Sequence, residues 1–388
     1  MKLRSATFCL LVALAFSKHS MGGQVKNAHA KGAESATSRP LPNRIIFQAF
    51  VVFDDTMRKL FKDTDEALQY ALAFFNSLNF IFRHMERPQV KFEVVDFLHK
   101  DLPFREHALV LEGEEMNMRE SVAKMGEYVN RNLRYKAADF VFLFTSRKLF
   151  TKKEDGTKEY GRPQGLTWEK GICNSTRKVI IVRDVERRFT ALSNAGFQLA
   201  RLLGAPTTCT PDFWDLRPNY NLFHLSHCAQ VTIREHIQSV NYDDPKGAKN
   251  CFWRKYTDSF HTSELPNSMI DEDNVCQKVE GMMEQYRRRG LCANNVDLSG
   301  HFENVYEYAN SLGNTSRTAE CLFDCCNTQM VGYFTVNYHL LSHKAFDGKP
   351  CANGQKVCVE GQCVENEVLE WIKPYSPEEE QQQQTNDE

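Results

Sequence analysis

The sequence has no long internal hydrophobic run and no excess of charge of either sign. No internal apolar stretch reaches the roughly 18 residues that a membrane-spanning helix requires. Lys and Arg number 48 and Asp and Glu number 50, for a net charge of -2, whereas a nucleic-acid-binding domain usually carries a clear basic excess. We therefore expect no membrane span in the body of the protein and no nucleic-acid partner. Hydrophobic residues make up 42% of the chain, which predicts a packed globular core.

The start of the chain has the features of a secretory signal peptide. Lys2 and Arg4 are positively charged, and Ala6–Phe16 is an apolar stretch too short to cross a membrane. The small residues Ala15 and Ser17 predict cleavage after about Ser17. We therefore expect residues 1–17 to be removed and the protein to be secreted; a buried N-terminal helix is the alternative interpretation.

Cysteine is absent between the signal peptide and Cys173 and is abundant afterwards. Of the 13 cysteines, Cys9 lies in the signal peptide, which leaves an even number. A secreted chain meets an oxidising compartment, so we expect disulfides in preference to a zinc knuckle, although the spacing alone does not fix the pairing. The disulfide candidates are Cys173, Cys209, Cys228, Cys251, Cys276, Cys292, Cys321, Cys325, Cys326, Cys351, Cys358 and Cys363.

Strand and helix patterns alternate over residues 43–250. This order predicts an α/β layer with a mixed, mostly parallel sheet. Residues 18–42 are small and polar and are predicted to be flexible, 251–365 to form a cysteine-rich module, and 366–388 to be a disordered acidic, Gln-rich tail. The predicted strands are Arg44–Phe53, Val90–Phe97, Ala138–Phe144 and Lys178–Val182, and the predicted helices are Thr64–Met85, Met118–Leu133, Phe189–Leu203 and Val231–Val240.

The helix predicted over Phe189–Leu203 contains the residues that bear on whether the protein has a catalytic site. On a helical wheel, Phe197 and Arg201 lie four residues apart, with Gln198 beside them, and Gly204 is placed to end the helix. Phe197 and Arg201 fall roughly opposite an apolar stripe that we expect to face the core, made of Leu192, Ala195, Leu199, Leu202 and Leu203.

The segment from Phe197 to Thr207 resembles the metzincin zinc-protease motif H-E-x-x-H-x-x-G-x-x-H, because the frame L-x-x-L-L-G-A-P is present. The segments on either side of this motif resemble those of the reprolysins, the snake-venom and ADAM-like branch of the metzincins. The nearest style is that of tick salivary reprolysin-like proteins, and the resemblance covers about residues 43–365. The flanking segments are Ala138–Arg147, Gly165–Trp168, Gly171–Asn174 and Lys178–Val182 before the helix, Leu225–Cys228 after it, and Cys321–Cys326 and Asp347–Cys363 in the cysteine-rich module.

The resemblance implies a metzincin-like α/β fold and a zinc endopeptidase, but the residues at the chemical positions differ. Phe197 stands where the first His would be, Gln198 where the catalytic Glu would be, and Arg201 and Thr207 where the second and third His would be, while Gly204 is kept. A phenyl ring has no lone pair for zinc, a guanidinium is a permanent cation, and an amide cannot act as general base. We therefore expect neither a bound metal or cofactor nor a catalytic residue.

The turn that carries Met in the family is placed at Trp214–Pro218, with Leu216 in place of Met. His339 and His343 have the i, i+4 spacing of a zinc pair, but the preceding residues favour a strand, in which the two side chains would lie far apart. A structural role is therefore the favoured interpretation.

Two sequons, at Asn174 and Asn314, are candidates for N-glycosylation in a secreted chain.

Three functions remain open from the sequence. The first is a secreted, salivary-type pseudoprotease that binds a host or other extracellular protein, such as a plasma or matrix protein. The second is an active zinc metalloendopeptidase with displaced ligands. The third is a structural or storage protein without a specific partner.

Overall fold

The computed structural model describes residues 41–99, 102–136, 138–160, 164–209, 225–243, 252, 259–270, 272–277, 289–291, 319–331 and 334–373. The expected signal peptide, nearly all of the segment 18–42, and residues 374–388 of the expected tail lie outside the described residues, as do Leu216 and Asn314.

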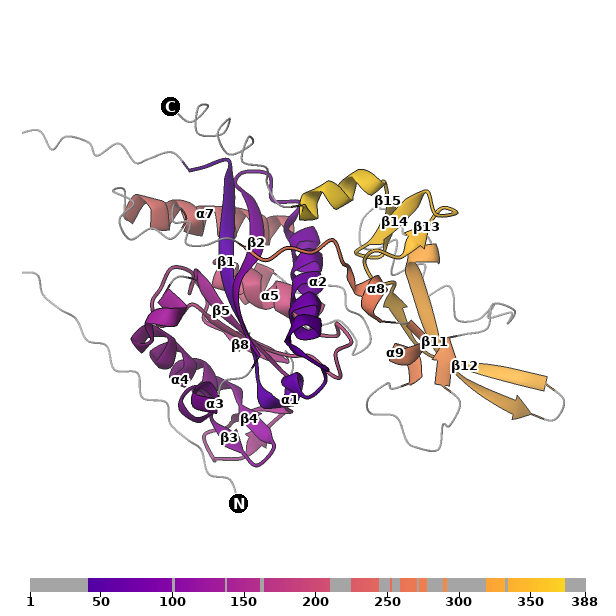
Figure 1. Cartoon of the computed structure of the whole chain (residues 1–388), viewed down its shortest axis with the longest axis horizontal. Helices are drawn as coiled ribbons and strands as arrows, with labels where there is room; N and C mark the ends of the chain where they lie inside the picture. The colour runs from indigo at the N-terminus through magenta and orange to yellow at the C-terminus, as the bar shows by residue number, and fades with distance from the viewer. Residues whose placement is uncertain are drawn as a thin grey trace, which may run out of the picture. The chain divides into compact units, whose positions relative to one another are not determined.

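A five-stranded sheet forms the centre of the first part of the chain (Figure 1). Its order is β2-β1-β5-β9-β8; the first four strands are parallel and β8 is antiparallel to β9. The predicted mixed, mostly parallel α/β layer is therefore confirmed. The strands are β1 (Arg44–Phe53), β2 (Gln89–Leu98), β5 (Phe140–Thr145), β8 (Gly165–Thr167) and β9 (Val179–Arg183).

Both faces of this sheet are covered by helices. On β1, Phe47 and Val51 belong to a core that includes α2, α5 and α7, whereas Phe50 and Val52 belong to a second core that includes α3 and α4. Burial on both faces explains why β1 and β5 are almost uninterrupted apolar runs. The helices are α1 (Asp55–Arg58), α2 (Thr64–Phe82), α3 (Leu102–Ala108), α4 (Met118–Arg131), η1 (Leu133–Lys136), α5 (Leu192–Leu202), η2 (Thr207–Cys209) and α7 (His227–Asp243).

The two longest predicted helices begin where the sequence places them. Asp63 caps α2 by accepting from the backbone N–H of Glu66 at 2.9 Å, and Asn117 caps α4 by accepting from Glu120. A side-chain acceptor at this position satisfies an N–H that the helix leaves free.

A second, four-stranded sheet of order β3-β4-β6-β7 was not anticipated from the sequence. Its strands are two to four residues long, too short for a periodicity to stand out. They are β3 (Leu111–Glu112), β4 (Glu115–Asn117), β6 (Leu149–Lys152) and β7 (Lys158–Glu159).

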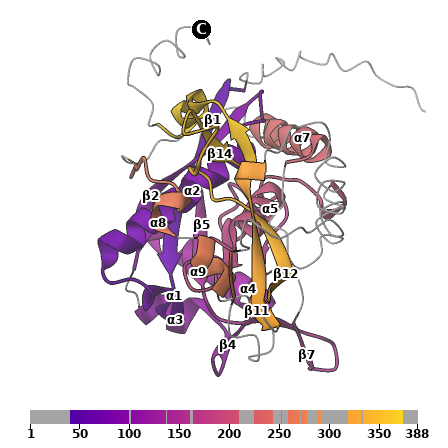
Figure 2. The same ribbon diagram turned by 90° about the vertical axis from the view of Figure 1, so that its right-hand side faces the viewer.

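The C-terminal part contains two three-stranded antiparallel sheets, β10-β11-β12 and β13-β14-β15. Figure 2 shows the two long strands β11 and β12 side by side. The elements are α8 (Pro266–Met269), α9 (Glu272–Gln277), β10 (Arg289–Leu291), η4 (Ala319–Cys321), β11 (Leu322–Val331), β12 (Phe334–Lys344), β13 (Pro350–Cys351), β14 (Lys356–Val359), β15 (Gln362–Val364) and η5 (Asn366–Ile372).

Residues on either side of the expected boundary at 250 contact one another. The Asn76 amide of α2 donates to the carbonyls of Thr262 and Glu264, each at 3.0 Å. Phe80 packs with Val359 and Ile372 in one buried cluster. Residues 366–372 therefore form a packed helical turn, although the sequence places them in a disordered tail.

None of the described helices combines the length and hydropathy needed to cross a membrane.

Candidate functional site

The turn between β9 and α5 is fixed by a buried carboxylate. Asp184, directly after β9, accepts from the N–H and hydroxyl of Thr190 at 2.9 and 2.8 Å and from the Tyr70 hydroxyl of α2. The Phe189 N–H in turn donates to the Tyr70 oxygen at 2.9 Å. Burial raises the pKa of both Asp184 and Tyr70. These contacts set where α5 begins, and therefore where the motif residues lie.

Phe197 is wholly buried. The helical wheel places it opposite the core stripe, yet it is 0% exposed and belongs to the same apolar cluster as Leu199. Lying opposite the apolar stripe does not expose Phe197, because neighbouring elements enclose most of α5.

Gln198 is also 0% exposed. Its Nε2 donates to the Gly165 carbonyl of β8 at 3.2 Å and to Asn194 Oδ1 at 3.3 Å, while its Oε1 has no hydrogen-bond partner. The carbonyl of Gln164 accepts from Arg183 of β9, so the next carbonyl, that of Gly165, points to the outer edge of the sheet. The Gln198 amide therefore donates to a carbonyl on the side of β8 that faces away from β9.

Arg201 is half-buried one turn further along α5. Its guanidinium carbon lies 5.9 Å from the centre of the Phe197 ring, and its Nε has no hydrogen-bond partner. Burial lowers the pKa of Arg201, and the carboxylate of Glu169 partly opposes this shift. A lowered arginine pKa still leaves a cation at neutral pH.

Gly204 ends the helix, as predicted. Its φ of 116° lies in the region that favours glycine, and a Cβ at this position would come within 2.6 Å of the His236 side chain of α7. Thr207 begins η2, and the disulfide Cys209–Cys228 joins η2 to the start of α7.

These residues do not fit a zinc ion. The position of the first ligand holds a buried hydrocarbon ring and that of the second a cation, and zinc requires imidazole, thiolate or carboxylate ligands. His339 and His343 both lie in strand β12, where four residues span about 13 Å, so they lack the spacing of a helical ligand pair.

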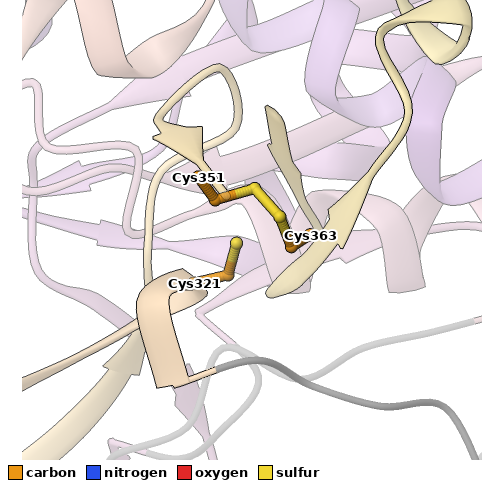
Figure 3. Close-up of side chains that lie close together, drawn as sticks. All are labelled: Cys321, Cys351 and Cys363. Atoms are coloured by element: carbon orange, nitrogen blue, oxygen red, sulfur yellow. A yellow bond between two sulfur atoms is a disulfide. The ribbon is translucent and has the colours of Figure 1, made fainter. Parts of the chain in front are cut away.

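Within the described ranges, the one group of three side chains with ligand spacing is Cys321, Cys351 and Cys363. All three sulfur atoms belong to disulfides, Cys321–Cys358 and Cys351–Cys363. Figure 3 shows the Cys321 sulfur beside the Cys351–Cys363 bond. A sulfur bonded to another sulfur is not a thiolate ligand.

In the part of the chain that the structure describes, eight of the candidate cysteines are disulfide-bonded. The described pairs are Cys209–Cys228, Cys321–Cys358 and Cys351–Cys363, and Cys173 and Cys276 are bonded as well. Cys325 and Cys326 lie in β11, whereas Cys251 and Cys292 fall outside the described residues.

The loop after β8 presents the predicted sequon residue Asn174 together with two exposed side chains, Trp168 and Arg177, to which the sequence analysis gave no role. Trp168 is 37% exposed, and the guanidinium carbon of Arg177 lies 5.7 Å from its ring centre. Asn174 is exposed, and its Oδ1 accepts from the N–H groups of Thr176 and Arg177 at 3.0 and 3.1 Å. The sequence signal that could have indicated an exposed Trp168 is its closeness to the sequon at Asn174, since sequons that carry glycans lie on the protein surface.

Comparison of the chain with protein-family models finds no match, and comparison with curated proteins finds none either.

Proposed function

We propose that this chain is a secreted, metzincin-like pseudoprotease of the reprolysin type, which acts by binding an extracellular protein and not by cleaving it. The observation that carries the proposal is the role of Gln198, which stands where the catalytic Glu would be. Its amide is buried and hydrogen-bonded to Gly165 and Asn194. An amide cannot take a proton from water near neutral pH.

Phe197 and Arg201 support the same conclusion. A buried phenyl ring supplies no electron pair, and a half-buried guanidinium would repel Zn²⁺ in a partly desolvated setting. The ring–guanidinium contact of 5.9 Å gives both side chains a structural role that does not depend on a metal.

The surface that we propose for partner binding is centred on Trp168 and Arg177. Tryptophan and arginine contribute strongly to protein interfaces, because each buries a large area and still carries polar groups that can form hydrogen bonds with the partner. The turn of Asn174, which bonds to the Arg177 N–H, holds Arg177 beside the indole. A partly exposed aromatic ring stacked by a fixed cation is suited to an extracellular protein partner.

Metal content and peptidase activity test the inert site. The purified protein should bind no stoichiometric zinc and should not cleave gelatin or fibrinogen in a chelator-sensitive manner. One tight zinc per chain together with such cleavage would instead establish the active endopeptidase with displaced ligands. A variant combining Phe197→His, Gln198→Glu, Arg201→His and Thr207→His should gain zinc binding; absence of binding in a folded variant would argue against the metzincin frame.

Binding to plasma proteins tests the proposed surface. Trp168→Ala should weaken saturable binding of a plasma partner about tenfold or more, as interface hot spots do. Leu133→Ala is the matched control, because Leu133 is 76% exposed and lies in η1, outside this loop. Absence of any saturable partner would favour the storage-protein alternative.

A further inference from the structure

Two disulfides of the C-terminal part lie directly against each other. Cys321–Cys358 joins η4 to β14, and Cys351–Cys363 joins β13 to β15. The sulfur atoms of Cys321, Cys351 and Cys363 all lie within 4.8 Å of one another (Figure 3). A thiolate freed from one bond therefore has a sulfur of the other bond within reach of a small side-chain movement.

The four sulfur-bearing residues differ in exposure. Cys321 and Cys358 are 0% exposed and Cys351 is 3% exposed, whereas Cys363 is partly exposed. Attack by an external thiolate depends on access to the sulfur. An external thiolate is therefore expected to attack the pair Cys351–Cys363 at Cys363.

Cys358 and Cys363 are also direct neighbours across the β14–β15 hairpin. The Cys358 N–H donates to Lys349 at 2.8 Å and its carbonyl accepts from Gly348 at 2.9 Å, so both groups point away from β15. The pair is then a non-hydrogen-bonded one, with Cα atoms typically about 4.5 Å apart. Such a separation lies at the short end of the range that a disulfide spans, about 4.4–6.8 Å.

We propose that Cys363 is a modification site at which a thiol, supplied by a small thiol or a dithiol oxidoreductase, starts an exchange of partners between these two disulfides. The thiolate attacks Cys363 Sγ, forms a mixed disulfide and releases the Cys351 thiolate. Cys351 attacks Cys321 Sγ and releases the Cys358 thiolate. Cys358 attacks Cys363 Sγ and returns the original thiolate. The products are Cys321–Cys351 and Cys358–Cys363, with no net oxidation or reduction.

The exchange takes place at a hairpin that contacts α2. The turn residue Glu360 forms an ion pair with Arg83, and its N–H donates to Asp347 at 2.7 Å. Val359 packs with Phe80 of α2. Exchange removes the link between β13 and β15 and ties β15 to β14, and therefore changes the covalent support of this contact.

Disulfide mapping of the full-length protein tests the proposal. The oxidised protein is incubated with reduced glutathione, quenched with acid and an alkylating agent, and digested without reduction. Cleavage after Lys356 and Glu360 and before Asp324 separates the four cysteines. We expect glutathione first at Cys363, followed by peptides that join Cys321 to Cys351 and Cys358 to Cys363, without a rise in total free thiol.

Two double variants control the experiment. Cys321→Ser with Cys358→Ser keeps the attacked pair and should abolish the exchanged peptides, while the glutathione adduct at Cys363 remains. Cys209→Ser with Cys228→Ser should leave the exchange intact. Glutathionylation of Cys363 in the wild-type protein without the new peptides would overturn the proposal, as would attack that begins elsewhere.

Discussion

Replacing the motif glutamine by glutamate, Gln198→Glu, should destabilise the protein and make its stability depend on pH. The Gln198 amide donates to two acceptors, Gly165 O and Asn194 Oδ1, in a site that is 0% exposed. A carboxylate there would face two acceptors with no donor and would be out of contact with water. Both features raise its pKa above that of the unfolded chain.

The magnitude follows from the cost of keeping the introduced carboxyl neutral. From a reference pKa of about 4.3, protonation at pH 7 costs roughly 1.4 kcal/mol per pH unit, or about 3.7 kcal/mol. The neutral acid retains one donor, so one of the two hydrogen bonds is lost, which adds about 1 kcal/mol. We expect Gln198→Glu to lose about 4–5 kcal/mol of unfolding free energy at pH 7.

The sign of the pH dependence is fixed by proton binding. Because the folded variant holds its proton more tightly than the unfolded chain, its stability relative to wild type falls as the pH rises above about 4.3. Below that pH the deficit should shrink to about 1 kcal/mol. Urea unfolding at several pH values measures both quantities.

Gln198→Met is the matched control, because it keeps the size of the side chain but removes both hydrogen bonds without adding a charge. Its loss should be about 1–3 kcal/mol and should not vary with pH. A Gln198→Glu protein that is as stable as wild type at pH 7, with no added pH dependence, would refute the buried, donor-only role of this amide.

Two further substitutions test the framework around α5. Tyr70→Phe should lower the unfolding free energy by about 2–3 kcal/mol, because it removes the hydroxyl that donates to the fully buried Asp184 carboxylate. Thermal unfolding measures this loss. A loss below about 0.5 kcal/mol, which is the range of ordinary surface substitutions, would contradict this role. Gly204→Ala should be clearly more destabilising than Gly113→Ala, since both glycines have positive φ but only at Gly204 would the new Cβ come within 2.6 Å of His236. Equal losses for the two glycine variants would show that the close approach to His236 is readily relieved.

The main elements of the α/β part could be predicted from the sequence because their signals are local. The strand β1 has the predicted bounds Arg44–Phe53, and α2 and α4 begin at the predicted residues. An apolar run buried on both faces and a helix with a side-chain cap leave patterns within a few residues of the chain.

The second sheet and the ordered turn at 366–372 could not be predicted in this way. Strand β4 pairs with β6, which lies about 33 residues further along the chain, and none of the strands β3, β4, β6 and β7 is long enough to show a period. Ile372 is ordered by a cluster around Phe80, nearly 300 residues earlier in the chain.

For the candidate site, the sequence alone determined which chemical groups are present: a ring, an amide, a guanidinium and a hydroxyl at Phe197, Gln198, Arg201 and Thr207. Residue identity settles whether a lone pair or a transferable proton exists, whatever the fold. Only the tertiary structure decided that Phe197 is enclosed and that the Gln198 amide is bonded to β8. Burial and hydrogen-bond partners depend on elements brought together from distant parts of the chain, and a helical wheel holds no information about them.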